Sequence, residues 1–248
     1  MPTHHISLHR RAIGRVLAIL ICGLLAASLL GQVSRFEFGH DQVFGLVRLF
    51  NVNEEGNVPT FFAVLLSIGS VMLLTVIGFA SRQTRKNDSR YWFALAAGFL
   101  FLSYDEAFQV HERLGDPMRQ LLGKSKLGFL YFGWVVPAII LVCVLALLFV
   151  KFLLRLPASS RRWMLFSGCL YLSGCIGMEL IGGKYFVMYG KDTLMYSVLT
   201  TIEEGLEMSG MAAFIYTLLG HIARTYPKIE FHIRAAAAAH SASQAEFS

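Results

Sequence analysis

The sequence predicts an all-α fold, a polytopic membrane helical bundle of six transmembrane helices with the N- and C-termini in the cytoplasm. Composition is the first reason, because 55% of the 248 residues are hydrophobic and only 15% are charged, which is too apolar for a soluble domain. Length is the second, since six apolar runs each exceed the 18 or so residues that span a bilayer. The third is that Lys and Arg collect between alternate runs.

The six runs cover residues 13–31, 59–80, 91–114, 129–154, 163–183 and 194–222. The first follows three arginines, but it is too long for a signal peptide and lacks a small-x-small cleavage site, so we expect a retained span. Pro59 suits the first turn of the second span. The turn-rich segment before Pro59 is expected to leave Glu54 and Glu55 solvated at the outer surface. Gly174 and Gly177 suit the fifth span to close helix packing.

The basic residues set the orientation and the domain plan. Most of the 22 Lys and Arg fall before residue 16, in the loops 81–90 and 151–162, and after residue 222, and such clusters mark the cytoplasmic side. We therefore expect residues 1–226 to form a single six-helix transmembrane domain of the plasma (inner) membrane, and residues 227–248 to form a mobile cytoplasmic tail. Short clusters do not make the continuous basic face of a nucleic-acid-binding protein, so we expect no nucleic-acid partner.

The feature of the sequence that points to a function is a group of acidic residues within the apolar runs. Seven carboxylates lie inside the third, fifth and sixth runs, with almost no Lys or Arg beside them: Asp105, Glu106, Glu112, Glu179, Glu203, Glu204 and Glu207. An ionised acid at the centre of a membrane helix costs roughly 2.5 to 3.5 kcal/mol. Seven of them facing lipid would cost about 20 kcal/mol, more than a typical folding free energy of about 5 to 15 kcal/mol. The acids are therefore expected to face one another inside the bundle.

Helix geometry predicts where they meet. With a rise of about 1.5 Å per residue, Asp105, Glu179 and Glu203 fall within about 8 Å of one another in depth, in the outer half of the bilayer. In one continuous third helix, Asp105 and Glu112 would share a face, and His111 would turn roughly 120° away. On the sixth run, a polar stripe is expected to hold Tyr196, Thr200, Glu203, Glu204, Glu207 and Met211.

Clustered carboxylates suggest a divalent metal. They are hard oxygen donors suited to Mn, Fe, Mg or Ca, and Zn also accepts them. The predicted ligands are Asp105, Glu106, His111, Glu112, Glu179, Glu203, Glu204 and Glu207. The Glu-x-x-His pair of helical di-iron sites is missing. A bound metal would activate water or oxygen against a lipophilic substrate, although the sequence assigns no catalytic residue and contains no nucleotide-cofactor motif.

Two alternatives need no metal. In the first, the same acids hold protons, because low dielectric and like neighbours favour the neutral form, and they serve a proton- or cation-coupled transporter. In the second, the protein is a structural membrane subunit whose protonated acids join helices by hydrogen bonds to hydroxyls such as Ser103 and Thr200. The partners are accordingly membrane lipid, together with a lipophilic small molecule, a cation or a proton. Four cysteines within apolar runs predict neither disulfides nor a thiolate zinc site.

Overall fold

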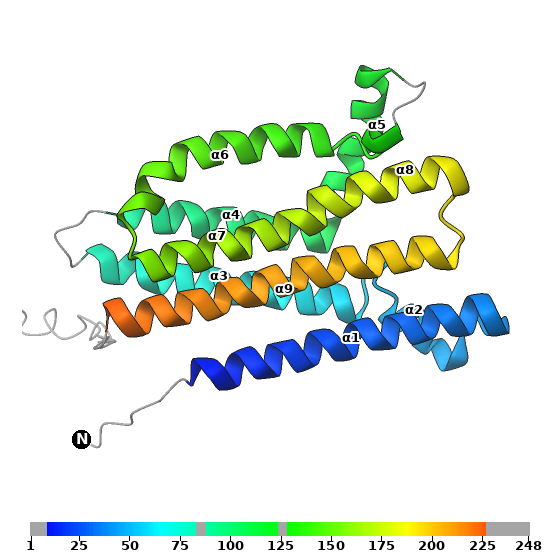
Figure 1. The fold of residues 1–248 in the computed structure, drawn as a ribbon, viewed down its shortest axis with the longest axis horizontal. Helices are drawn as coiled ribbons and strands as arrows, with labels where there is room; N and C mark the ends of the chain where they lie inside the picture. The colour runs from blue at the N-terminus through cyan, green and yellow to red at the C-terminus, as the bar shows by residue number, and fades with distance from the viewer. Residues whose placement is uncertain (1–8, 83–87, 124–127, 227–248) are drawn as a thin grey trace, which may run out of the picture.

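The computed structural model describes residues 9–82, 88–123 and 128–226, which form a helical bundle without a strand among them (Figure 1). The expected tail at 227–248 lies outside the described residues. The long helices are α1 (Arg10–Phe38), α3 (Val58–Arg82), α4 (Ser89–Phe108), α6 (Val135–Arg155), α7 (Ala158–Leu172), α8 (Glu179–Tyr189) and α9 (Leu194–Thr225). A π-helical segment, η3 (Ser173–Met178), joins α7 to α8. Short helices are η1 (Val43–Gly45), α2 (Leu46–Phe50), α5 (Val110–Leu122) and η2 (Gly128–Leu130).

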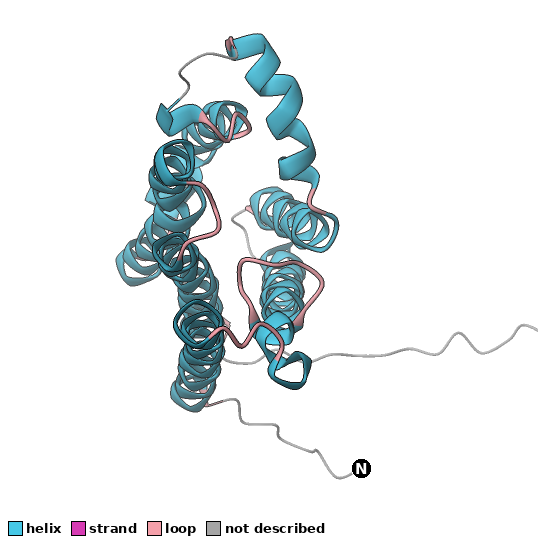
Figure 2. Ribbon diagram, turned by 90° about the vertical axis from the view of Figure 1, so that its right-hand side faces the viewer, coloured by secondary structure: helices cyan, strands magenta, loops and turns pink. Residues whose placement is uncertain are grey.

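The long helices are arranged in two layers. Seen end-on, α3 and α4 form one layer and α1, α9 and the α7–α8 helix form the other (Figure 2). α9 lies at the centre and packs against α1, α3 and α7. With 32 residues it is about 48 Å long, more than a bilayer core of about 30 Å. Residues on α9 are therefore positioned to meet side chains from both layers.

Five helices are long and apolar enough to cross a membrane: α1, α3, α6, the combined α7–α8 helix and α9. α4 pairs with α3 along its length but is less apolar, since Asp105 and Glu106 lie near its end. The outer surface is strongly hydrophobic, with Leu147 76% exposed and Ile19 72% exposed. A soluble protein rarely exposes so much apolar surface. These properties together are those of an integral membrane protein.

Local sequence explains the helix ends. Asn57 accepts a hydrogen bond from the backbone N–H of Thr60 and so caps α3, and Thr193 caps α9 by accepting from the N–H of Tyr196. α1 ends where Gly39 takes a left-handed conformation with φ of 68°. Pro157 separates α6 from α7. The helices are thus bounded by residues that satisfy or stop the backbone hydrogen bonds.

The apolar core fills one half of the bundle. The end where α1 begins and α9 ends is called the basic end, because Arg10, Arg82, Arg155 and Arg224 lie at helix ends there. Two packed clusters of buried residues extend from it toward the middle: Leu74, Ile77, Trp92, Ala96, Phe152, Leu156, Met164, Phe214 and Leu218, and then Ile21, Leu66, Met208, Met211, Ile215 and Leu219. The other half of the bundle carries the acids.

The prediction of one helix over residues 91–114 is wrong. α4 stops at Phe108 because Gln109 takes a left-handed conformation with φ of 53°. A new helix, α5, begins at Val110 and leaves the direction of the bundle (Figure 1). Residues 115–122, which follow the third predicted run, are therefore helical as well. Asp105 and Glu112 belong to different helices and do not share a helix face.

Candidate functional site

Three helices bring the predicted acids together. Asp105 and Glu106 lie in the last turn of α4, Glu179 begins α8, and Glu203, Glu204 and Glu207 lie in the first half of α9. The charge of Glu204 interacts with those of Glu106 and Glu179, and Glu207 interacts with the same two groups. The acids from α4, α8 and α9 therefore face the same space rather than separate patches of lipid.

The deepest part of the site is a small cavity of about 20 Å³. That volume admits about one water molecule. Carboxylates of Glu106, Glu204 and Glu207 line it, and none of its lining residues is Lys or Arg. The remaining walls come from four helices and include Ala63, Ser67, Leu102, Tyr171, Met208 and Met211. Three acids from two helices thus surround a space for one small guest.

Glu179 and Glu203 form a second part of the site. Their carboxyl groups lie within hydrogen-bonding reach of each other, which requires one proton or another cation between them, because two carboxylates only accept. Trp134, just before α6, donates from Nε1 to Oε1 of Glu179 at 2.7 Å. The sequence did not point to Trp134, since it lies 45 residues from Glu179 and is one of several aromatic residues near the start of α6.

His111 makes two contacts with Asp105, although a continuous third helix would have turned it away from that residue. Its backbone N–H donates to Oδ1 of Asp105 at 2.8 Å, and its Nδ1 lies 2.9 Å from Oδ2. The left-handed conformation of Gln109 makes this possible, because it ends α4 and brings the first turn of α5 beside Asp105. α5 lies beyond the end of α4 and outside the long helices. Burial opposes protonation of His111, but the hydrogen bond and charge of Asp105 outweigh burial, so the pKa of His111 is raised.

Glu55 joins the outer edge of the site, although it was expected to be solvated. It lies in the turn between α2 and α3, near the charges of Glu112, His111 and Asp105, and its side chain bonds that of Gln109. Crowding by protein atoms and the negative charge of Glu112 raise the pKa of Glu55. Glu112 itself is exposed on α5. A turn residue distant in sequence carried no signal that could have linked it to this cluster.

The π-helical segment η3 fixes the distance between α7–α8 and α9. A Cβ on Gly174 would lie 2.7 Å from Cγ of Glu207 and 2.8 Å from the backbone oxygen of Glu203. Only glycine permits this approach, since real Cβ atoms do not come so close. π segments are rare and occur often at functional sites. Here Glu179 directly follows the segment, so the insertion sets the position of a site carboxylate.

The acids do not form a ready-made metal site. Across residues 9–82, 88–123 and 128–226, no three His, Cys, Asp or Glu side chains converge as ligands of one ion. Two groups of acids appear instead of one: the cavity group of Glu106, Glu204 and Glu207, and the outer pair of Glu179 and Glu203. All four cysteines are free, and three of them are exposed on the apolar surface.

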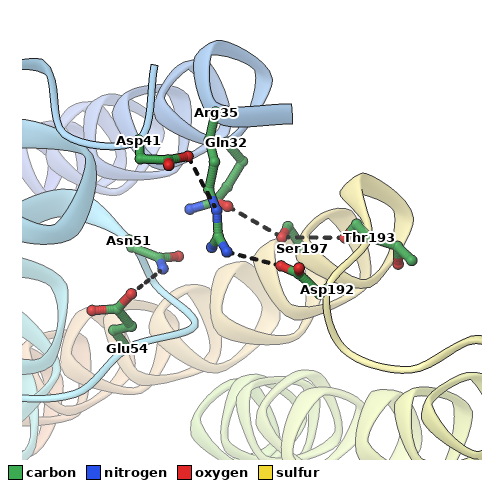
Figure 3. A network of polar contacts seen from close by, with 8 residues as sticks. All are labelled: Gln32, Arg35, Asp41, Asn51, Glu54, Asp192, Thr193 and Ser197. Carbon is green, nitrogen blue, oxygen red and sulfur yellow. Dashed lines mark hydrogen bonds and ion pairs between the residues drawn. The ribbon is translucent and has the colours of Figure 1, made fainter. Parts of the chain in front are cut away.

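Polar contacts close the bundle beside the site. Arg35 near the end of α1 donates from Nη2 to Asp192 at 2.8 Å, and Ser197 on α9 donates to Oε1 of the buried Gln32 at 3.3 Å. Figure 3 shows both contacts between the α1 end and the start of α9. These contacts hold α1 and α9 together at the end opposite the basic end.

Comparison with known families covers most of the chain. Residues 14–222 match the family described as a domain of unknown function, DUF8692. The chain belongs to the DUF8692 family. No curated protein and no solved structure matches it. The DUF8692 match includes all eight predicted site residues as well as Glu55 and Trp134, so the acidic site lies within the family domain and not in an appended segment.

Proposed function

We propose that this DUF8692 protein is a six-span plasma-membrane protein with both termini in the cytoplasm, and that it transports a cation or protons through a carboxylate site in the outer half of the bilayer. Support for six spans comes from α4, which is the sixth long helix and pairs with α3. Support for the orientation comes from the arginines of the basic end, which belong on the cytoplasmic side by the positive-inside rule.

The observation that carries the transport proposal is the cavity lined by Glu106, Glu204 and Glu207. Three carboxylates around a low-dielectric space require positive charge, because like charges there repel strongly. The cavity admits one water-sized guest, so a proton, hydronium or desolvated metal ion fits. A lipophilic substrate beside that guest does not fit, which favours cation binding over metal-dependent catalysis.

The number of acids argues against a purely structural role, and the hydroxyl groups near them add little to it. Thr200 and Thr201 both donate to the backbone oxygen of Ser197, at 3.1 and 2.6 Å. Each hydroxyl has one proton to donate, so these two use theirs within α9 and could meet a protonated carboxyl group only as acceptors. Seven acids also exceed what helix association needs, since single polar contacts between membrane helices contribute about 0.6 kcal/mol on average.

A metal-dependent enzyme remains the second candidate, and one observation favours it. Asp105 holds Nδ1 of His111, which is how carboxylates orient histidine ligands in metal sites. Nε2 of His111 would then be free to bind a divalent metal, with Glu179 nearby. The metal would supply Lewis acidity to water or oxygen, and Asp105 would keep the imidazole ring in place.

Reconstituted liposomes test the transport proposal. Wild-type protein should carry protons, or Mn²⁺ as the metal probe, down an imposed gradient, as read by a pH-sensitive or metal-sensitive dye inside the vesicles. Glu204→Gln and Glu207→Gln should reduce uptake to the rate of empty liposomes, because each removes a carboxylate from the cavity. Glu37→Gln, an exposed change at the end of α1, should leave uptake unchanged.

Metal analysis of the same preparations separates the candidates. Protein purified in mild detergent without a chelator should hold no stoichiometric metal if protons are transported. Stoichiometric Mn, Fe or Zn that is lost in Asp105→Asn, together with no ion uptake, would replace the transport proposal with the enzyme. Unchanged uptake and raised thermal stability in both cavity variants would leave only a packing role for the acids.

A further inference from the structure

Two arginines meet at the basic end, far from the acids. α1 and α9 lie side by side there (Figure 1), and Gly220 of α9 faces the start of α1. A Cβ on Gly220 would lie 2.5 Å from Nη1 of Arg10 and 3.2 Å from Nη1 of Arg224. Both guanidinium groups therefore lie over the same glycine, which leaves them room by having no side chain.

A buried serine orients Arg224. Nη2 of Arg224 donates to Oγ of Ser160 at 3.2 Å, and Ser160 is fully buried. Oγ of Ser160 also lies 3.0 Å from Nδ1 of His221. The guanidinium group is thus held from one side by α7, while its Nη1 edge is turned toward Arg10.

An aromatic ring contacts Arg10. Its guanidinium group lies over the ring of Tyr216, 5.1 Å from the centroid. Tyr216 in turn contacts Trp163 edge-on, with centroids 6.0 Å apart. Trp163 is 45% exposed and faces outward from α7. Trp and Tyr are enriched at the headgroup level of membranes, so the two arginines lie where such rings normally meet lipid headgroups.

Within the part of the chain that the structure describes, no acid pairs with Arg10 or Arg224. Asp88, an acid at the same end, is bound to Arg155 at 2.6 Å. Two adjacent guanidinium groups repel each other unless an anion lies between them. A phosphate group suits this position, because its oxygens accept paired hydrogen bonds from guanidinium groups.

We propose that Arg10 and Arg224 bind the phosphate group of an anionic phospholipid headgroup, with the lipid chains lying along the exposed face of Trp163. The position at one end of the bundle fits a lipid, since a headgroup phosphate lies at that level while the chains extend along the helices. Ser160 and Gly220 are positioning residues: the first orients Arg224, and the second leaves space for both side chains. This site is independent of the proposed cation transport.

Lipid-dependent thermal stability tests the proposal. Full-length protein in mild detergent should unfold at a higher temperature when dioleoylphosphatidylglycerol is added, and dioleoylphosphatidylcholine or inorganic phosphate should have little effect. Arg10→Gln and Arg224→Gln should each weaken the apparent affinity for the anionic lipid about tenfold, the loss expected for one charge-assisted hydrogen bond. Arg15→Gln is the matched control, because it removes the same charge from the next turns of α1, on another face.

Three results would overturn the proposal. Arg10→Gln and Arg15→Gln could respond equally to the anionic lipid, which would make the effect one of general charge. Inorganic phosphate could stabilise the protein as strongly as the lipid, which would indicate a free-anion site. Phosphatidylcholine could raise the unfolding temperature as much as phosphatidylglycerol, which would show that the anionic headgroup is not needed for binding. If Arg224→Gln fails to fold because its contact with Ser160 is lost, Arg10→Gln decides alone, since Arg10 is only partly buried.

Discussion

At the scale of single residues, the conformation of Gln109 decides how the outer part of the site is built. A left-handed non-glycine residue is uncommon, and here its position ends α4 and returns the chain toward Asp105. Asp105 then accepts the backbone N–H of His111, so a carboxylate in the last turn of one helix caps the first turn of the next. The site gains an imidazole that a straight helix would have turned away.

The bond between Asp105 and His111 should make stability depend on pH. Because the pKa of His111 is raised in the folded protein, its protonation stabilises the fold fully below its unfolded pKa of about 6.5, and this contribution is lost as pH rises through the folded pKa. We expect His111→Gln to lose about 1 to 2 kcal/mol at about pH 6 and much less at about pH 9. Thermal unfolding in detergent at both pH values measures the difference.

The control for this pH dependence is Glu37→Gln, which should unfold at the wild-type temperature at both pH values. An equal loss for His111→Gln at low and high pH would show that the side chain contributes by packing against Trp134, whose ring centroid is 4.7 Å away, and not by its charge.

At this scale the sequence carries chemical signals but not conformational ones. The inward position of Glu106, Glu204 and Glu207 follows from the cost of placing charge in lipid, which the sequence alone reveals. The contributions of Glu55 and Trp134 do not, because they depend on how a turn and a helix end fold over the bundle. The left-handed conformation at position 109 could not be predicted, because the residue there is glutamine and not glycine or asparagine.

At the scale of elements, the π-helical segment is the part that could not be foreseen. Helix periodicity in the sequence predicts 100° per residue throughout the fifth span, and one wider turn changes the direction of every side chain after it. Glu179 is the first residue after the segment. The approximate limits of the long helices were, in contrast, readable from apolar length, and Pro59 indicated the first turn of α3.

Gly174→Ala should destabilise the protein and separate α7–α8 from α9. Its new methyl group would overlap Glu207 and the backbone of Glu203, and overpacking of this kind costs about 1 to 3 kcal/mol. Gly177→Ala, in the same segment, is the matched control, because nothing lies within 4 Å of its Cβ position. It should be neutral or slightly stabilising, since alanine is the better helix former.

Thermal unfolding and ion uptake should both be measured for this pair of variants. We expect Gly174→Ala to lose uptake along with stability, because Glu207 lines the cavity. Equal unfolding temperatures for the two variants would mean that α9 moves away from the methyl group at little cost in free energy. In that case η3 does not fix the geometry of the site.

At the scale of the whole molecule, neighbouring long helices along the chain alternate in direction when α7 and α8 are taken as one helix, so that α1 begins where α9 ends (Figure 1). The fold class was predicted from composition, and the described residues are helical throughout their long segments. The number of spans was harder to predict. Asp105 and Glu106, which belong to the candidate site, also lower the hydropathy of α4, and α4 is therefore not among the five apolar helices.

Reporter fusions test the topology. Green fluorescent protein joined after Tyr226 should fluoresce and alkaline phosphatase at that point should be inactive, because α9 ends at the basic end, which the proposed topology places in the cytoplasm. Fusion after Gly190, in the turn between α8 and α9, should give the opposite pair of results. The same result at both points would mean that α9 does not cross the membrane, and the six-span arrangement would then be wrong.

The packed core beneath the cavity has an electrical consequence. Leu66, Met208, Met211 and Ile215 belong to a cluster of buried apolar side chains that packs between the carboxylates and the basic end. We expect an ion that enters from the acid side to meet these packed apolar side chains and to leave again on the acid side. A membrane containing the closed protein should therefore carry no steady current, and net movement of charge would require the helices around α9 to shift with each ion.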